Sequence, residues 1–130
     1  MNPNPNNYTS LEMSRKLVEA GIVLETSTYY VKEKTNEADC YELMYRIGEW
    51  FYLSTEAYYL RYKVASCEYY PAFSMSELWM ELPNDTRILK GYVSGKAIVW
   101  ISDTCESIMN ANPCDALAEL LIYVRKEGRG

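Results

Sequence analysis

Three sites in the chain carry the residue pattern with which an α-helix begins, and they divide it into helical and β-rich segments. Thr9 and Ser74 are each followed three positions later by glutamate, the spacing of a capping box. Asn112 stands before Pro113, and proline is favoured at the first position of a helix. The predicted helices cover about residues 10–20, 75–82 and 113–126.

The apolar residues of these segments indicate which side of each helix is buried. Gly21 tolerates the left-handed conformation that ends a helix, so the first helix should stop there. Phe73 and Leu78 occupy the two positions of a hydrophobic staple around the second helix start. Apolar residues at helical spacing predict the buried positions Met75, Leu78, Trp79 and Leu82 in the second helix and Leu117, Leu120, Leu121 and Val124 in the third.

Residues 22–70 are rich in tyrosine, valine and threonine, which are favoured in strands. Two such runs, TSTYYVKEK and CYELMYRI, flank the polar sequence KTNEAD and predict a hairpin with a long turn. Residues 48–68 fit either a further strand or a short helix over TEAYYLRYKVA. Both interpretations stay open on the sequence alone.

A second hairpin is predicted from the runs RILKGYV and KAIVWIS, with Ser94 and Gly95 as a two-residue turn. Apolar groups stand on both faces of this hairpin, so we expect it to be central or covered, and we expect both Trp100 and Trp79 to belong to the core. In the predicted register the opposed pairs are Leu89 with Trp100, Gly91 with Ile98 and Ile88 with Ile101.

The order of these elements predicts an α+β fold. Consecutive strands are joined by turns and not by crossover helices, which favours antiparallel hairpins with about three helices packed on the sheet. A chain of 130 residues with 48% hydrophobic residues can bury one sizeable core, so a single domain is expected over residues 8–130. Residues 1–7, with two prolines and four asparagines, are expected to form a flexible lead-in.

Charge and hydropathy exclude several classes of function. The net charge is −5 and no basic patch is visible, which argues against nucleic-acid binding. No secretion signal begins the chain, and no apolar run approaches the roughly 20 residues of a membrane helix. We therefore expect a cytoplasmic protein, and we identify no cofactor, metal or small-molecule substrate.

The chain contains no histidine, which excludes Ser-His, Cys-His and His-metal sites. Its four cysteines lack close pairs, so a zinc site is not expected. Cys114 lies in the first turn of the last predicted helix, where amide groups can stabilise a thiolate, but Asp115 opposes this and packing is the expected role. Carboxylate pairs at Glu77 with Glu81, expected on the outward side of the second helix, and at Asp103 with Glu106 are further catalytic candidates.

Thirteen tyrosines include three adjacent pairs, at 29–30, 58–59 and 69–70. Neighbours on a strand point to opposite faces, so each pair would place one ring inward and one outward. Outward tyrosines suit interfaces because they bring a large contact area at low entropic cost. Tyr30, Tyr59 and Tyr69 are the predicted contact residues, for a homodimer or another protein, although all three rings could simply cover the sheet.

The blocks YPAFSMSELWMELP and NPCDALAELLIYVRKEG resemble a family of small uncharacterised proteins encoded by phages and prophages of gut bacteria. The resemblance implies a mobile-element origin and a cytoplasmic α+β domain, and it implies no activity, cofactor or catalytic residue. With the residue patterns, it leads us to expect a non-enzymatic accessory protein that binds another protein or itself. The alternatives are a small enzyme or redox-sensitive protein using Cys114 or acidic residues, and an acidic mimic that binds a nucleic-acid-binding host protein.

Overall fold

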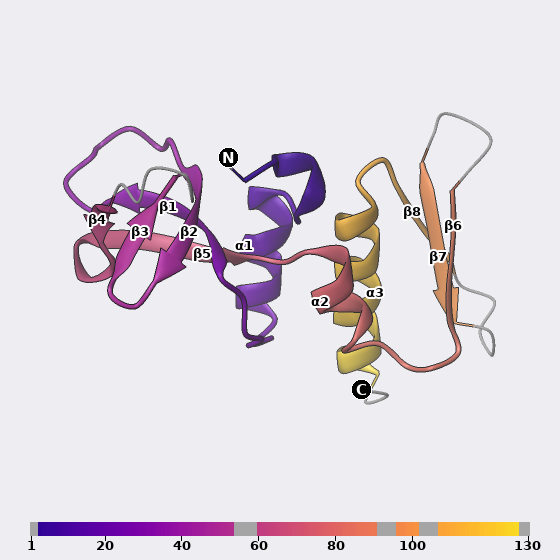
Figure 1. The fold of residues 1–130 in the computed structure, drawn as a ribbon. Helices are drawn as coiled ribbons and strands as arrows, with labels where there is room; N and C mark the ends of the chain where they lie inside the picture. Colours follow the sequence, from indigo (N-terminus) through magenta and orange to yellow (C-terminus); the bar gives the residue numbers. More distant parts are fainter. Residues whose placement is uncertain (1–2, 54–59, 91–95, 102–106, 128–130) are drawn as a thin grey trace.

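The structure is a computed structural model that describes residues 3–53, 60–90, 96–101 and 107–127. Within them, three α-helices accompany two antiparallel sheets, which confirms the predicted α+β class. One sheet has five strands in the order β4-β3-β2-β1-β5, and the other has three in the order β6-β7-β8. Figure 1 shows α1 between the five-stranded sheet and the pair α2 and α3, with the three-stranded sheet beyond α3.

The helices are α1 (Leu11–Glu19), α2 (Met75–Trp79) and α3 (Pro113–Lys126), with 3-10 turns at Pro5–Asn7 and Val64–Ser66. The strands are β1 (Thr28–Glu33), β2 (Glu42–Ile47), β3 (Trp50–Tyr52), β4 (Leu60–Lys63), β5 (Cys67–Ala72), β6 (Thr86–Lys90), β7 (Ala97–Ile101) and β8 (Ser107–Asn110). No helix of the described residues is long and apolar enough to cross a membrane.

Helix α1 begins one residue later than the capping pattern predicts. The hydroxyl of Ser10, and not that of Thr9, accepts the hydrogen bond from the amide of Met13. Thr9 is fully buried, and its hydroxyl lies 2.8 Å from that of Ser14. The helix ends as predicted, with Gly21 at a φ of +75°. The hydroxyl of Thr9, which the local sequence predicts as the helix cap, therefore makes a tertiary contact instead.

The N-terminal residues expected as a flexible lead-in have defined structure from Pro3 onward. Pro3 is buried, and Pro5–Asn7 form a 3-10 turn capped by the side chain of Asn4. Tyr8 then forms a β-bridge with Ser74, at the start of α2. Tyr8 is thus held at the start of α2, whereas residues 4–7 are exposed.

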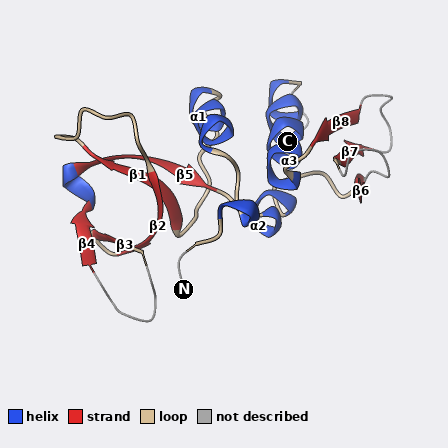
Figure 2. Ribbon diagram, turned by 90° about the horizontal axis from the view of Figure 1, so that it is seen from above, coloured by secondary structure: helices blue, strands red, loops and turns tan. Residues whose placement is uncertain are grey.

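The tyrosine-rich middle of the chain forms the five-stranded sheet. The predicted hairpin is present as β1 and β2, and β3 and β4 continue it as a meander before β5 returns to the free side of β1. Residues 60–63 are therefore strand, whereas residues 54–59 of the alternative helix lie outside the described residues. Figure 2 shows that the sheet curls, and its interior holds a core of Val31, Met44, Phe51 and Cys67.

Helix α2 has the predicted start but is shorter than predicted. Ser74 and Glu77 form both bonds of the capping box, and the staple residue Leu78 is fully buried. The helix ends at Trp79, before the expected stop at Pro83, and Met80 caps it. Of the four residues predicted to be buried, Leu78 and Leu82 are buried, whereas Met75 is 39% exposed. Trp79 is 43% exposed, and its assignment to the core was wrong.

The second hairpin has the predicted strands in a different register. Leu89 pairs with Ile98 and Ile88 with Val99, a shift of two residues from the prediction. The predicted turn at 94–95 lies outside the described residues. A two-residue shift preserves which face each side chain occupies, because strand side chains alternate with a period of two. The apolar pattern that identifies the faces therefore could not fix the register.

Only one face of the three-stranded sheet is covered by described elements, contrary to the prediction. Ala97 and Val99 are buried beneath α3, whereas Leu89 and Met109 on the opposite face are 45% and 56% exposed. Trp100 is half-buried and pairs with Arg87. The core residues predicted for α3, Leu117, Leu120, Leu121 and Val124, are all buried, and they form the main cluster with residues of α1, α2 and β7.

Candidate functional site

The early end of α2 leaves an apolar groove between α2, β6 and α3. Its volume is about 380 Å³, and Ser76 supplies the one polar side chain of its lining. The side chains of Trp79 and Met80 stand out of the helix end, with Met80 81% exposed. We name this the α2–β6 groove; it is lined by Met75, Ser76, Trp79, Met80, Ile88 and Leu117.

The sequence places these residues at a surface because Leu78 alone anchors the short helix. Leu78 is fully buried, while Met75 on the preceding turn is 39% exposed. Methionine adapts its shape to irregular partners, and tryptophan is frequent among residues that dominate binding energies. The groove is therefore suited to bind an apolar side chain of a partner. The site could not be predicted from the sequence because helical spacing places Trp79 in the core.

A second, smaller hollow of about 260 Å³ lies between the end of α1 and the rim of the curled sheet. Tyr69 is 40% exposed here, and its ring packs on Tyr29 and Phe51 at centroid distances of 5.6 and 5.5 Å. Val23, at the entrance, is 90% exposed. The hollow is lined by Val18, Ile22, Val23, Leu24, Tyr29, Tyr69 and Pro71.

Two of the predicted contact tyrosines, Tyr30 and Tyr69, lie on opposite faces of the five-stranded sheet. Tyr30 is only 9% exposed, and its hydroxyl donates a hydrogen bond to the carbonyl of Thr9 at 2.7 Å. Its inclusion in a contact surface was therefore wrong, because α1 and its approach cover this side of β1. Tyr69 remains partly accessible in the second hollow, and Tyr59 lies outside the described residues.

Tyr30 gives a testable pH dependence. Burial raises the pKa of Tyr30 to about 12, and the nearby Asp115 and Cys114 act in the same direction. An unfolded tyrosine titrates near pH 10, so the contribution of this phenol to stability is complete below about pH 10 and is lost as the pH rises towards 12. We expect Tyr30→Phe to lower the free energy of unfolding by about 1–2 kcal/mol at pH 7. Urea unfolding between pH 7 and 11 should show a weaker decline for the variant.

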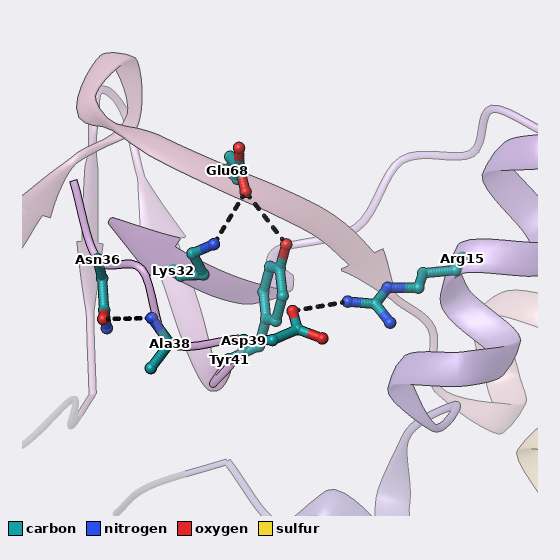
Figure 3. A network of polar contacts seen from close by, with 7 residues as sticks. All are labelled: Arg15, Lys32, Asn36, Ala38, Asp39, Tyr41 and Glu68. Carbon is teal, nitrogen blue, oxygen red and sulfur yellow. Dashed lines mark hydrogen bonds and ion pairs between the residues drawn. The ribbon is translucent and has the colours of Figure 1, made fainter. Parts of the chain in front are cut away.

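Charged and aromatic side chains tie the β1–β2 loop to α1 and β5 (Figure 3). The guanidinium of Arg15 lies 5.2 Å from the ring of Tyr41 and 3.3 Å from a carboxylate oxygen of Asp39. Glu68 accepts a hydrogen bond from Tyr41 at 3.3 Å and pairs with Lys32 at 3.4 Å. Each of these charges has a partner within the network, which indicates a structural role.

Of the acidic pairs singled out in the sequence, Glu77 and Glu81 each bond to other residues. Glu77 turns inward, contrary to the prediction, because Oε1 accepts hydrogen bonds from the amide of Ser74 and the hydroxyl of Thr26. Glu81 lies instead 3.3 Å from the guanidinium of Arg125. Asp103 and Glu106 lie outside the described residues, within which no group of His, Cys, Asp or Glu could hold a metal ion.

Cys114 is fully buried at the start of α3, where its amide donates to the side chain of Asn112. Burial raises the pKa of the thiol to about 11, and the charge of Asp115 acts in the same direction. Desolvation thus outweighs the thiolate stabilisation expected from the first turn of a helix. Cys67 is also buried, Cys40 is exposed, and Cys105 lies outside the described residues.

Slow alkylation of Cys114 is therefore expected in the native protein. Iodoacetamide at pH 7.5 should modify Cys40 faster than Cys114, which should react only as fast as the chain opens. Peptide mass spectrometry with and without urea would measure both rates. Rapid native modification of Cys114 at pH 6 would instead favour the redox or enzymatic alternative.

Comparisons with protein-family models, curated proteins and solved structures found no match to this chain. The geometry of the described residues is therefore the basis for assigning a site. On that basis the α2–β6 groove is the strongest candidate, because it combines the larger volume with exposed tryptophan and methionine side chains.

Proposed function

We propose that the protein is a non-enzymatic accessory protein that works by binding another polypeptide chain through the α2–β6 groove. The observation that carries the proposal is the exposure of Trp79, Met75 and Met80 around an apolar groove of about 380 Å³. Tryptophan and methionine are enriched at protein–protein interfaces relative to the rest of the protein surface. An origin in a phage or prophage is part of the proposal through the family resemblance alone.

Trp79 is the expected anchor of this interaction. Tryptophan in a desolvated pocket often accounts for 2 kcal/mol or more of binding energy, so Trp79→Ala should weaken binding by a factor of about 30 or more. The same change should lower the free energy of unfolding by about 1 kcal/mol or less, because the side chain is 43% exposed. A loss of binding with little loss of stability separates a contact residue from a core residue.

Affinity capture with the tagged full chain tests this proposal. The captured partner can be another protein or an untagged second copy of the same chain. The wild type and Ile47→Ser should retain the same stoichiometric partner, and Trp79→Ala should lose it. Ile47 is a matched control because it is 53% exposed on β2 and lines neither hollow. If the partner survives Trp79→Ala, or is lost equally with Ile47→Ser, the α2–β6 groove is not the binding site.

A further inference from the structure

Strand β6 ends the three-stranded sheet and, among the described strands, pairs only with β7. The amide of Thr86 donates to the carbonyl of Pro83 at 3.0 Å, so it does not point towards β7. In an antiparallel ladder, the main-chain groups of alternate residues point to the same side. The amide and carbonyl of Ile88 therefore point to the edge that no described strand covers, while Arg87 and Leu89 bond to β7.

The open edge and the α2–β6 groove share a residue. The side chain of Ile88 lines the groove, and its main chain faces the edge. A strand added to β6 would thus run beside Trp79 and Met80. Strand addition of this kind takes its affinity from main-chain bonds and its specificity from adjacent side-chain pockets.

Strand β6 is complementary to a second copy of itself. Its five residues, Thr86–Lys90, have Ile88 at the centre. Two antiparallel copies related by a two-fold axis at Ile88 place Arg87 opposite Leu89 and Thr86 opposite Lys90. Arg87 then faces Leu89 and not its own equivalent. Like charges directly opposite each other would destabilise the pair. The charge pattern therefore permits self-pairing in this register.

We propose that the protein forms a homodimer by antiparallel pairing of β6 with β6 of a second copy, which creates a continuous six-stranded sheet. The pairing joins the two grooves beside the dimer axis, so that each copy covers Trp79 and Met80 of the other. This inference rests on the proposed function and names its binding partner as the same chain.

Register-specific cross-linking of the full chain tests the proposal, in a background with Cys40 and Cys105 replaced by serine. Ile88→Cys should form an intermolecular disulfide under mild oxidation, because the paired Cα atoms lie about 5.5 Å apart in a hydrogen-bonded pair. Arg87→Cys is the matched control. Its two copies are diagonal in the proposed register, beyond the roughly 7 Å limit for a disulfide. Equal cross-linking of the two variants would overturn the register.

Sedimentation velocity of the wild type should show a dimer that dissociates on dilution. Ile88→Pro removes an amide that faces the edge and none that bonds to β7, so it should yield a monomer, whereas Ile88→Val should dimerise. Thermal unfolding of both variants would show whether each is folded. A folded wild type that stays monomeric at millimolar concentration would overturn the proposal. If the wild type is monomeric but captures a different protein in a Trp79-dependent way, the proposed function stands and only the homodimer is ruled out. If no partner is captured either, both the homodimer and the proposed function are ruled out.

Discussion

Replacing Phe73 by alanine is expected to lower the free energy of unfolding by about 3–5 kcal/mol, the usual cost of deleting a buried aromatic ring. Phe73 is fully buried in the main core, where α1, α2 and α3 meet. Its amide and carbonyl also bond to Thr9, the residue before the cap of α1. The ring thus packs at the junction where β5 ends and α2 begins.

Chemical denaturation monitored by circular dichroism would measure this loss. Phe73→Leu is the matched control, because it keeps an apolar side chain of comparable reach and should cost less than half as much. A loss below 1 kcal/mol for Phe73→Ala would contradict the packing described for the core. The variant keeps every main-chain bond to Thr9, so its effect reports on the ring alone.

A second large effect is expected at Asp115, which connects α3 to the start of α1. Its carboxylate accepts a hydrogen bond from the amide of Ser10 at 2.7 Å, and the residue is 8% exposed. Asp115→Ala leaves that amide without its acceptor, so we expect a loss of about 1.5–3 kcal/mol in the free energy of unfolding. The carboxylate also lies in the first turn of α3, where a negative charge is favourable.

Asp115→Asn separates these contributions because its side-chain oxygen can still accept the hydrogen bond. We expect it to lose about half as much stability as Asp115→Ala in the same denaturation experiment. Hydrogen exchange at the amide of Ser10 should accelerate with Asp115→Ala and change little with Asp115→Asn. Unchanged exchange in the alanine variant would show that the bond does not hold α1 to α3.

Local signals predicted the helix starts well because the atoms involved are close in sequence. The Ser74–Glu77 box and the Asn112 cap formed as expected, since each satisfies amides within three residues of itself. At Thr9 the local rule was displaced by one residue. The hydroxyl of Thr9 bonds to the hydroxyl of Ser14 and accepts a hydrogen bond from the amide of Phe73, which is 64 residues away. A contact so distant in sequence leaves no local signal.

The tyrosine faces of β1 could not be predicted because this strand is covered on both sides. Tyr30 faces α1, and Tyr29 faces the interior of the curl, where it packs on Phe51. Alternation along a strand separates the two rings but does not say which of them meets solvent. The groove was missed for a related reason. Helical spacing suggested a longer stripe through Trp79, whereas α2 ends at that residue.

The most direct test of the proposed binding surface is methionine oxidation by hydrogen peroxide, followed by peptide mass spectrometry. Met80 borders the α2–β6 groove and Met109 lies on the uncovered face of the three-stranded sheet, and they are 81% and 56% exposed. Both should oxidise readily in dilute purified protein. In concentrated extract of the producing cells, we predict that Met80 is protected several-fold relative to Met109. An unchanged ratio of the two rates would contradict the assignment of the groove as the binding surface.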